Sequence, residues 1–247
     1  MRTLLVIALI IALGHFENYG QENKKFSYQF NVGTSVTIPY EKNIEFVFFQ
    51  PIKGSNKTDY ETNLGYYAEI LALYNINNKF SITSGLTYNH TSYKIKDGYV
   101  SQWSEGYLNN SYLNVPLLFN YRPSENDSFS VSVGPYFGFI LFAQEKGTLY
   151  LDTSELIVVD RNDPLLQPEQ KYKNDIVKDY YSIDYGILLQ LSQEFRLSKE
   201  ISVVIITRLN YGLRNIISSN VDTRETMHSA AVEWKNYNVL LGLGIKI

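Results

Sequence analysis

The stretch FSYQFNVGTSVTIPY, residues 26–40, alternates between apolar and polar side chains. Every even position from Phe26 to Tyr40 except Thr34 is apolar or aromatic, whereas the odd positions are mostly Ser, Thr, Asn and Gln. A two-residue period places the apolar side chains on one face of a β-strand. The fold therefore depends on whether that face points into a protein core or out into lipid.

The same alternation returns in seven later segments, separated by turn signals such as Asn77-Asn78 and the RPSEND run at 122–127. The predicted strands cover 26–40, 64–76, 80–88, 113–121, 129–141, 181–191, 201–211 and 237–247. No credible helix or domain boundary interrupts them. The pattern predicts an all-β domain with eight antiparallel strands in up-and-down order.

The lengths of strands and connections favour lipid. A strand in a soluble domain averages about 5–6 residues, whereas a tilted membrane strand needs about 9–11. Tight turns alternate with longer polar segments at 41–62, 97–110, 146–178 and 213–234. Membrane barrels show this asymmetry, with short periplasmic turns and long extracellular loops. The eight apolar phases contain no Asp, Glu, Lys or Arg, as a lipid-facing surface requires.

The aromatic residues in the apolar phases lie near the two ends of the predicted strands. Those expected near the long loops are Tyr66, Tyr88, Tyr181, Tyr211 and Tyr237; those expected near the short turns include Phe80, Phe129 and Phe195. Two such rings are typical of membrane barrels, where aromatic side chains sit at both interfaces. A lipocalin-like secreted barrel also has eight strands, but its apolar phase would point inward around a ligand.

The amino-acid composition excludes several kinds of partner and site. With 45% hydrophobic residues the chain can bury a core, and with a net charge of −3 and no long basic run it shows no sign of a nucleic-acid partner. There are 0 cysteines, so disulfides, thiol catalysis and cysteine-zinc sites are excluded. Residues 1–20 resemble a secretory signal peptide, because Arg2 precedes an apolar run from Leu4 to Leu13. The mature barrel domain is then 21–247.

The phases predicted to face the lumen carry five charged residues: Glu69, Asp184, Glu194, Arg208 and Lys246. Three of them, Glu69, Asp184 and Arg208, are expected at similar heights toward the outer half of the barrel. An eight-stranded barrel is wide enough only for its own side chains or one small ligand. Charges in so narrow a space need partners, so we expect Arg208 to bridge one or both carboxylates. The arrangement predicts a polar plug, with a gated path for a proton or small solute as the alternative.

Catalysis and metal binding have little support in the sequence. A nucleophile needs a base beside it, and after leader removal only His90 and His228 remain. We expect His90 to face lipid, and His228 and its neighbour Ser229 to point to opposite faces if they lie in a strand.

The oxygens of Asp152, Asp160, Asn162 and Asp163 match no EF-hand spacing. No cofactor or metal is therefore predicted. The expected partners are membrane lipid and an envelope protein bound through the loops 146–178 and 213–234.

Five segments resemble a known family when taken in order. They are GYYAEILALYNINNKFSITSGLTYNH (65–90), SYLNVPLLFNYRP (111–123), GPYFGFILFA (134–143), DYGILLQL (184–191) and RLNYGLRNI (208–216). This order and spacing resembles the PorT-like outer-membrane β-barrel family of Gram-negative bacteria. The chain departs from the common pattern at its end, where Ile247 replaces the usual Phe. The resemblance implies the fold and the location, and it does not imply an activity.

The sequence thus predicts a transmembrane β-barrel in the bacterial outer membrane that is not an enzyme. Its expected role is that of a surface scaffold, an adhesin or a subunit of an envelope or secretion complex. A narrow gated channel, a barrel-embedded lipid hydrolase and a secreted lipocalin-like barrel are the alternatives.

Overall fold

The computed structural model describes residues 25–42, 57–99, 102–123, 128–151, 169–198, 200–217 and 233–247. Its strands are β1 (Phe26–Lys42), β2 (Lys57–Thr62), β3 (Leu64–Asn75), β4 (Phe80–Tyr99), β5 (Gln102–Tyr121), β6 (Phe129–Leu151), β7 (Glu169–Asp175), β8 (Ile183–Arg196), β9 (Ser202–Gly212) and β10 (Glu233–Lys246). One 3₁₀ turn, η2 (Val177–Asp179), precedes β8. Among these residues no helix is long and apolar enough to cross a bilayer. The predicted signal peptide lies outside the described residues.

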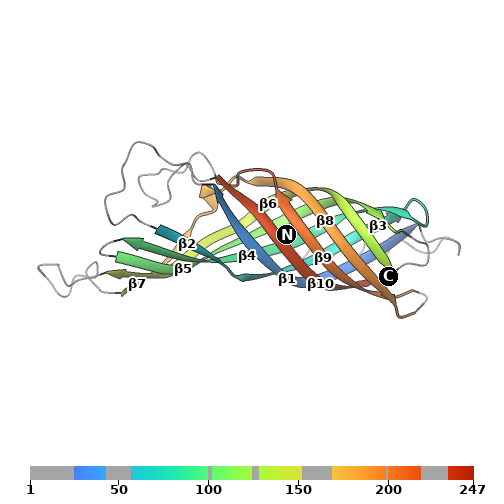
Figure 1. The fold of residues 1–247 in the computed structure, drawn as a ribbon, viewed down its shortest axis with the longest axis horizontal. Coiled ribbons are helices and arrows are strands. Elements are labelled where there is room, and N and C mark those ends of the chain that lie inside the picture. The colour runs from blue at the N-terminus through green and yellow to red at the C-terminus, as the bar shows by residue number, and fades with distance from the viewer. Residues whose placement is uncertain are drawn as a thin grey trace, which may run out of the picture.

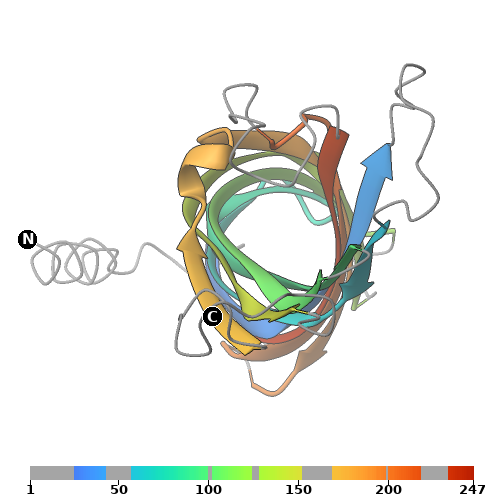
Figure 2. The ribbon, with the colours of Figure 1, turned by 90° about the vertical axis from the view of Figure 1, so that its left-hand side faces the viewer.

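Eight strands form a closed antiparallel barrel (Figures 1 and 2). Each strand pairs with the next in the order β1, β3, β4, β5, β6, β8, β9 and β10, and β10 pairs with β1 to close the ring. Short turns follow β3, β5 and β8 at one end, here called the inner end. The opposite end, with the longer connections, is called the outer end. The predicted eight-stranded barrel is confirmed.

The two remaining strands lengthen the barrel wall at its outer end (Figure 1). β2 pairs with β4 beyond the part that β3 covers, and β7 pairs with the outer half of β6, whose inner half pairs with β8. Long parts of the predicted loops 41–62, 97–110 and 146–178 are therefore strand, which corrects the sequence-based boundaries. β4 and β5 have 20 residues each and β6 has 23, so they rise well beyond a membrane-spanning length.

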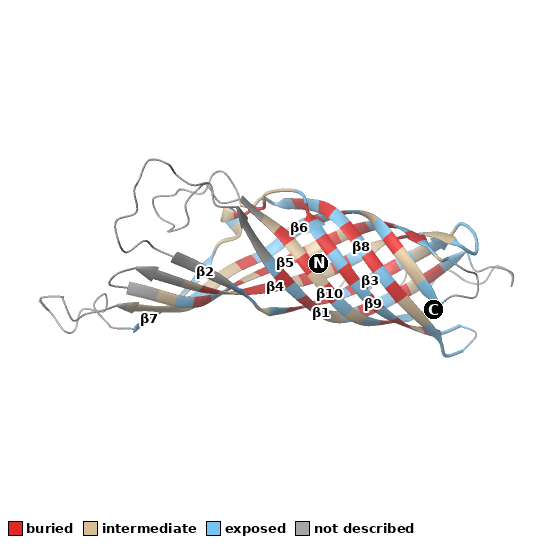
Figure 3. Cartoon of the chain, viewed as in Figure 1, coloured by how far each residue is buried: buried red, intermediate tan, exposed pale blue. Residues whose placement is uncertain are grey.

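The apolar phase points outward along the barrel (Figure 3). In β1, Val32 is 63% exposed, whereas the adjacent Asn31 is 1% exposed and faces the lumen. In β10, Leu241 is 55% exposed beside a fully buried Leu240. This direction is opposite to the one that a lipocalin-like barrel requires. Burying the outward side chains in lipid is favoured by the hydrophobic effect, at about 25 cal/mol per Å² of apolar surface.

The lumen is less polar than the sequence pattern predicted. Leucine and isoleucine side chains are buried inside it from several strands: Leu71, Leu118, Leu188, Ile206 and Leu240. Tyr67 of β3 lies against Gly33 of β1 and Gly242 of β10, where any side chain would collide with its ring. Packed side chains therefore fill the middle of the barrel, as expected for eight strands.

At the outer end of β4, the inward side chains become apolar and the outward side chains become charged. On β4 the inward residues change from Asn89 to Tyr93 and Ile95, and the outward residues change from Leu86 to Lys94. On β6 a bulge at Leu141 shifts the alternation by one residue, because Ser111 pairs with Phe142 and Tyr112 with Ile140. Phe139 and Phe142 are therefore both exposed, and Ala143 is buried.

A small apolar core lies at this end, and we call it the cap core: Tyr93, Ile95, Leu108, Ala143, Tyr180 and Ile216. Burial raises the pKa of the Tyr180 hydroxyl well above its ordinary value. The outer end is thus built like a soluble β-domain on top of a membrane barrel.

Candidate functional site in the barrel lumen

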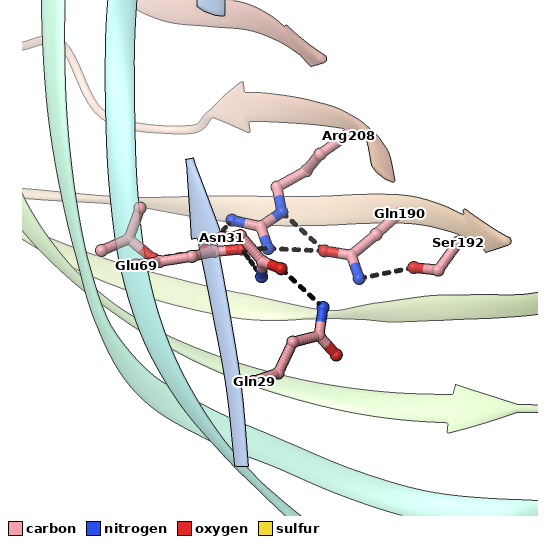
Figure 4. A network of polar contacts seen from close by, with 7 residues as sticks. Gln29, Asn31, Glu69, Gln190, Ser192 and Arg208 are labelled. Atoms are coloured by element: carbon pink, nitrogen blue, oxygen red, sulfur yellow. Dashed lines mark hydrogen bonds and ion pairs between the residues drawn. The ribbon is translucent and has the colours of Figure 1, made fainter. Parts of the chain in front are cut away.

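A buried ion pair crosses the middle of the lumen (Figure 4). Arg208 of β9 donates from Nη1 to Glu69 Oε2 at 2.7 Å and from Nη2 to Glu69 Oε1 at 2.8 Å. Both side chains are almost fully buried, at 2% and 0% exposure. Planar guanidinium and carboxylate groups match in this bidentate geometry, which is the strongest form of the pair.

Neutral side chains complete the hydrogen bonding of both charges. Gln190 of β8 accepts from Arg208 Nε at 2.8 Å and from Nη2 at 2.5 Å. Asn31 donates to Glu69 Oε1 at 2.6 Å, and Thr87 donates to Glu69 Oε2 at 2.8 Å. Gln29 donates to Asn31 at 2.9 Å, and Gln190 to Ser192 at 2.8 Å. The network therefore links β1, β3, β4, β8 and β9 across the barrel.

The third predicted lumen charge lies apart from this pair. Asp184 of β8 accepts hydrogen bonds at Oδ2 from the Tyr136 hydroxyl at 3.0 Å and from Asn236 Nδ2 at 2.9 Å. Its Oδ1 is buried and has no hydrogen-bond partner among the described residues. Arg208 thus bridges one carboxylate, Glu69, and not the other.

The supporting residues were not identified from the sequence. Gln29, Asn31, Thr87 and Gln190 all lie in the inward phase, so their orientation was predictable. Their contacts were not, because the stagger of the strands around a closed barrel decides which inward residues meet.

The network separates two parts of the lumen. Toward the inner end lies a cavity of about 540 Å³, and Gln190 lines it as well as holding Arg208. Toward the outer end lie other buried side chains, such as Tyr112 and Tyr136, and the cap core. The arrangement can hold the barrel shut, because breaking a buried ion pair leaves an uncompensated charge that costs about 3–5 kcal/mol.

The predicted interfacial aromatics lie on the outer surface of the wall. Tyr66 is 53% exposed, Tyr211 is 47% exposed and Phe195 is 47% exposed, and Phe129 is also exposed. Tyr88, Tyr181, Tyr237 and Phe80 are partly buried by their neighbours. The rings contact each other in pairs, with centroids 4.7 Å apart for Tyr211 and Tyr237 and 6.1 Å apart for Tyr66 and Tyr88.

His90 lies on the outward face of β4 and stacks on Tyr66, with ring centroids 4.8 Å apart. Its Nδ1 is 2.9 Å from the hydroxyl of Ser111 on β5, which also accepts a hydrogen bond from Tyr88. A histidine beside a serine is half of a nucleophilic site. No carboxylate orients this ring among the residues that the structure describes.

The other candidate residues are not placed. His228, Ser229 and the predicted calcium oxygens of Asp152, Asp160, Asn162 and Asp163 lie outside the described residues, as do most of the loops proposed to bind partners. In the described ranges, no group of three or more His, Asp and Glu side chains is positioned to hold a metal ion.

Comparison with known proteins identifies one matching family and several distantly similar structures. A family model described as "Outer membrane protein beta-barrel domain" matches residues 16–218. OprG from Pseudomonas aeruginosa is 13% identical with a TM-score of 0.43, covering 92% of this chain and 98% of that chain.

Two further structures are equally distant. Neisserial surface protein A is 10% identical with a TM-score of 0.39, covering 92% and 99% of the two chains. Ail of Yersinia pestis, solved with the heparin analogue sucrose octasulfate, is 10% identical with a TM-score of 0.38, covering 90% and 99%. The curated proteins contain no match to this chain.

Proposed function

Because the chain belongs to the family of outer membrane protein beta-barrel domains and resides in the bacterial outer membrane, we propose that it is a closed, non-enzymatic scaffold. In this role the barrel anchors the protein, and the part beyond the membrane binds a partner. Short turns of such barrels face the periplasm, so the inner end defined above is periplasmic and the outer end is extracellular.

The buried pair of Glu69 and Arg208 is the observation that carries the proposal. It fills the lumen with fixed, hydrogen-bonded side chains from five strands. A solute crossing the barrel would have to break this pair and displace leucines buried in the lumen, such as Leu188 and Leu240. The energy of that rearrangement opposes passage and supports an anchoring role over a channel.

The outer end supplies a rigid surface for binding. β2 and β7 widen the wall formed by β4, β5 and β6, and the cap core fixes these strands from inside. The outward residues here include the charged Lys94, Lys96 and Glu61, and Lys96 donates to Glu61 at 3.0 Å. Polar groups presented on a rigid β-scaffold are typical of a binding surface.

The finer resemblance to PorT-like barrels supports a partner in the cell envelope. It rests on the order of the five segments quoted above, and it favours a subunit of an envelope or secretion complex over an independent adhesin. In this proposal the loops 146–178 and 213–234 contribute to partner binding.

Two measurements test the scaffold. The purified protein in planar lipid bilayers is expected to show no stepwise conductance, and a stable conductance would support the channel instead. A partner isolated with the protein in mild detergent should be lost in Lys94→Glu/Lys96→Glu. It should remain with Lys79→Glu, which also introduces negative charge but at the periplasmic end.

One observation favours the hydrolase alternative: Nδ1 of His90 lies 2.9 Å from Oγ of Ser111. The pair faces outward near the tyrosines Tyr66 and Tyr88, where lipid ester groups lie. A fluorescent phospholipid in mixed micelles tests it. The scaffold proposal predicts no turnover, whereas turnover that Ser111→Ala abolishes would establish the hydrolase.

A further inference from the structure

The cavity at the periplasmic end has the charge of an anion-binding site. Its volume is about 540 Å³, within the range of about 300–1,000 Å³ that small-ligand pockets occupy. The turn between β3 and β4 and the ends of β5, β8 and β10 form its walls. It is open toward the periplasm and ends at the plug of Arg208 and Glu69. It is therefore a cup and not a passage.

Cationic side chains dominate this cup. Five of them line it: Lys25, Lys79, Arg122, Arg196 and Lys246. Glu194 is the one carboxylate in the lining. Because five cations line one cavity, their combined field attracts an anion into the cup. Arg122 and Lys246 are partly buried, whereas Lys25, Lys79 and Arg196 are exposed at the mouth.

Glu194 neutralises only part of the excess. It accepts from Lys246 Nζ at 2.8 Å and from Arg122 Nη2 at 3.3 Å. The remaining cations, Lys25, Lys79 and Arg196, form no ion pair with any carboxylate in the described part of the chain. Three positive charges are thus left for a ligand near the mouth.

The walls also provide neutral donors at greater depth. Ser132 and Ser192 are 2% and 7% exposed and line the cup beneath the cations. Their hydroxyl groups can donate hydrogen bonds to the oxygens of an anion in the cup.

We propose that this cup binds a small, soluble, multiply charged phosphate compound from the periplasm. Arginine forks and lysine ammonium groups suit the several oxygens of phosphate. A lipid headgroup is a poorer fit, because its acyl chains lie outside the barrel wall and the headgroup would have to bend over the rim. The proposal is independent of the scaffold function, since the cup faces away from the extracellular surface.

Titration calorimetry in an uncharged detergent tests the proposal, with inorganic pyrophosphate as the probe. Saturable binding is expected, and Lys79→Gln/Arg196→Gln should weaken it at least tenfold. Lys94→Gln/Lys96→Gln removes the same charge at the opposite end and should leave the affinity unchanged. Glu194→Gln should tighten binding several-fold, because it removes the carboxylate that competes for Lys246 and Arg122.

Three results would overturn the proposal. The first is no binding at 10 mM pyrophosphate by a wild-type barrel that keeps its folded mobility on unheated gels. The second is equal weakening by the cup and control variants, which would indicate non-specific attraction to net charge. The third is binding of dihexanoylphosphatidylglycerol without binding of pyrophosphate, which would assign the cup to a lipid headgroup.

Discussion

The guanidinium of Arg208 and the carboxylate of Glu69 form two parallel hydrogen bonds of 2.7 and 2.8 Å across 139 residues of sequence. This one contact ties the strands near the end of the chain to those near its start. It also separates the periplasmic cup from the capped extracellular end. The contact therefore joins β3 and β9 across the lumen through their side chains.

Replacing one member of this pair should destabilise the barrel more than replacing both. Arg208→Ala leaves Glu69 charged and buried, at an expected cost of about 3–5 kcal/mol. Arg208→Leu/Glu69→Leu removes both charges and should recover most of that loss. Urea titration of the protein refolded into lipid vesicles measures the difference. Equal stability of the wild type and Arg208→Ala would show that the pair is not a plug.

A charge on the outward face should oppose insertion into the membrane. Leu241 lies in the middle of the apolar run of β10 and is 55% exposed on the outer surface. Leu241→Arg is expected to cost about 2–4 kcal/mol of stability in lipid, because the guanidinium enters hydrocarbon. The same vesicle titration applies, with Thr148→Arg in the outward phase of the outer part of β6 as the control. An unchanged stability for Leu241→Arg would mean that this face does not contact lipid.

Disrupting the cap core should loosen the outer end without unfolding the membrane-spanning part of the barrel. Ile95 is 3% exposed among Leu108, Tyr180 and Ile216. Ile95→Asp buries a charge without a partner, so β2, β7 and the outer halves of β4 to β6 should loosen while the membrane part stays folded. Limited proteolysis of intact cells is expected to cleave this variant at its extracellular end and to leave a protected membrane fragment. Lys96→Asp changes an outward residue one position away and should remain resistant.

The sequence predicted the direction of the side chains better than their contacts. Alternation in β1 placed Val32 outside and Asn31 inside, because a strand fixes this choice locally. The pairing of Arg208 with Glu69 and not with Asp184 depends on the stagger of a closed barrel, which no local pattern encodes.

The outer strands were predictable in principle. Tyr93 and Ile95 alternate with Lys94 and Lys96 in the phase opposite to Leu86 and Tyr88. Such a reversal marks the point where a strand leaves the membrane. The predicted strand 80–88 and loop 97–110 leave these residues unassigned, because the prediction follows one outward apolar phase and that phase ends at Tyr88. On β6 the bulge at Leu141 adds a residue, and its position depends on the pairing with β5.

Tyr67 and Gly242 allow a test of packing in the lumen. A methyl group at Gly242 would meet the hydroxyl and ring of Tyr67, so Gly242→Ala should destabilise the barrel by about 1–3 kcal/mol through overpacking. The Tyr67 hydroxyl is buried without a hydrogen-bond partner in the described residues. Tyr67→Phe alone should therefore be neutral or slightly stabilising.

In the double variant Tyr67→Phe/Gly242→Ala, the atom that the new methyl group would meet first is gone, so part of the loss should return. Urea titration of all four proteins in vesicles gives the coupling between the two positions. Additive effects would mean that Tyr67 does not lie over Gly242 in the folded barrel.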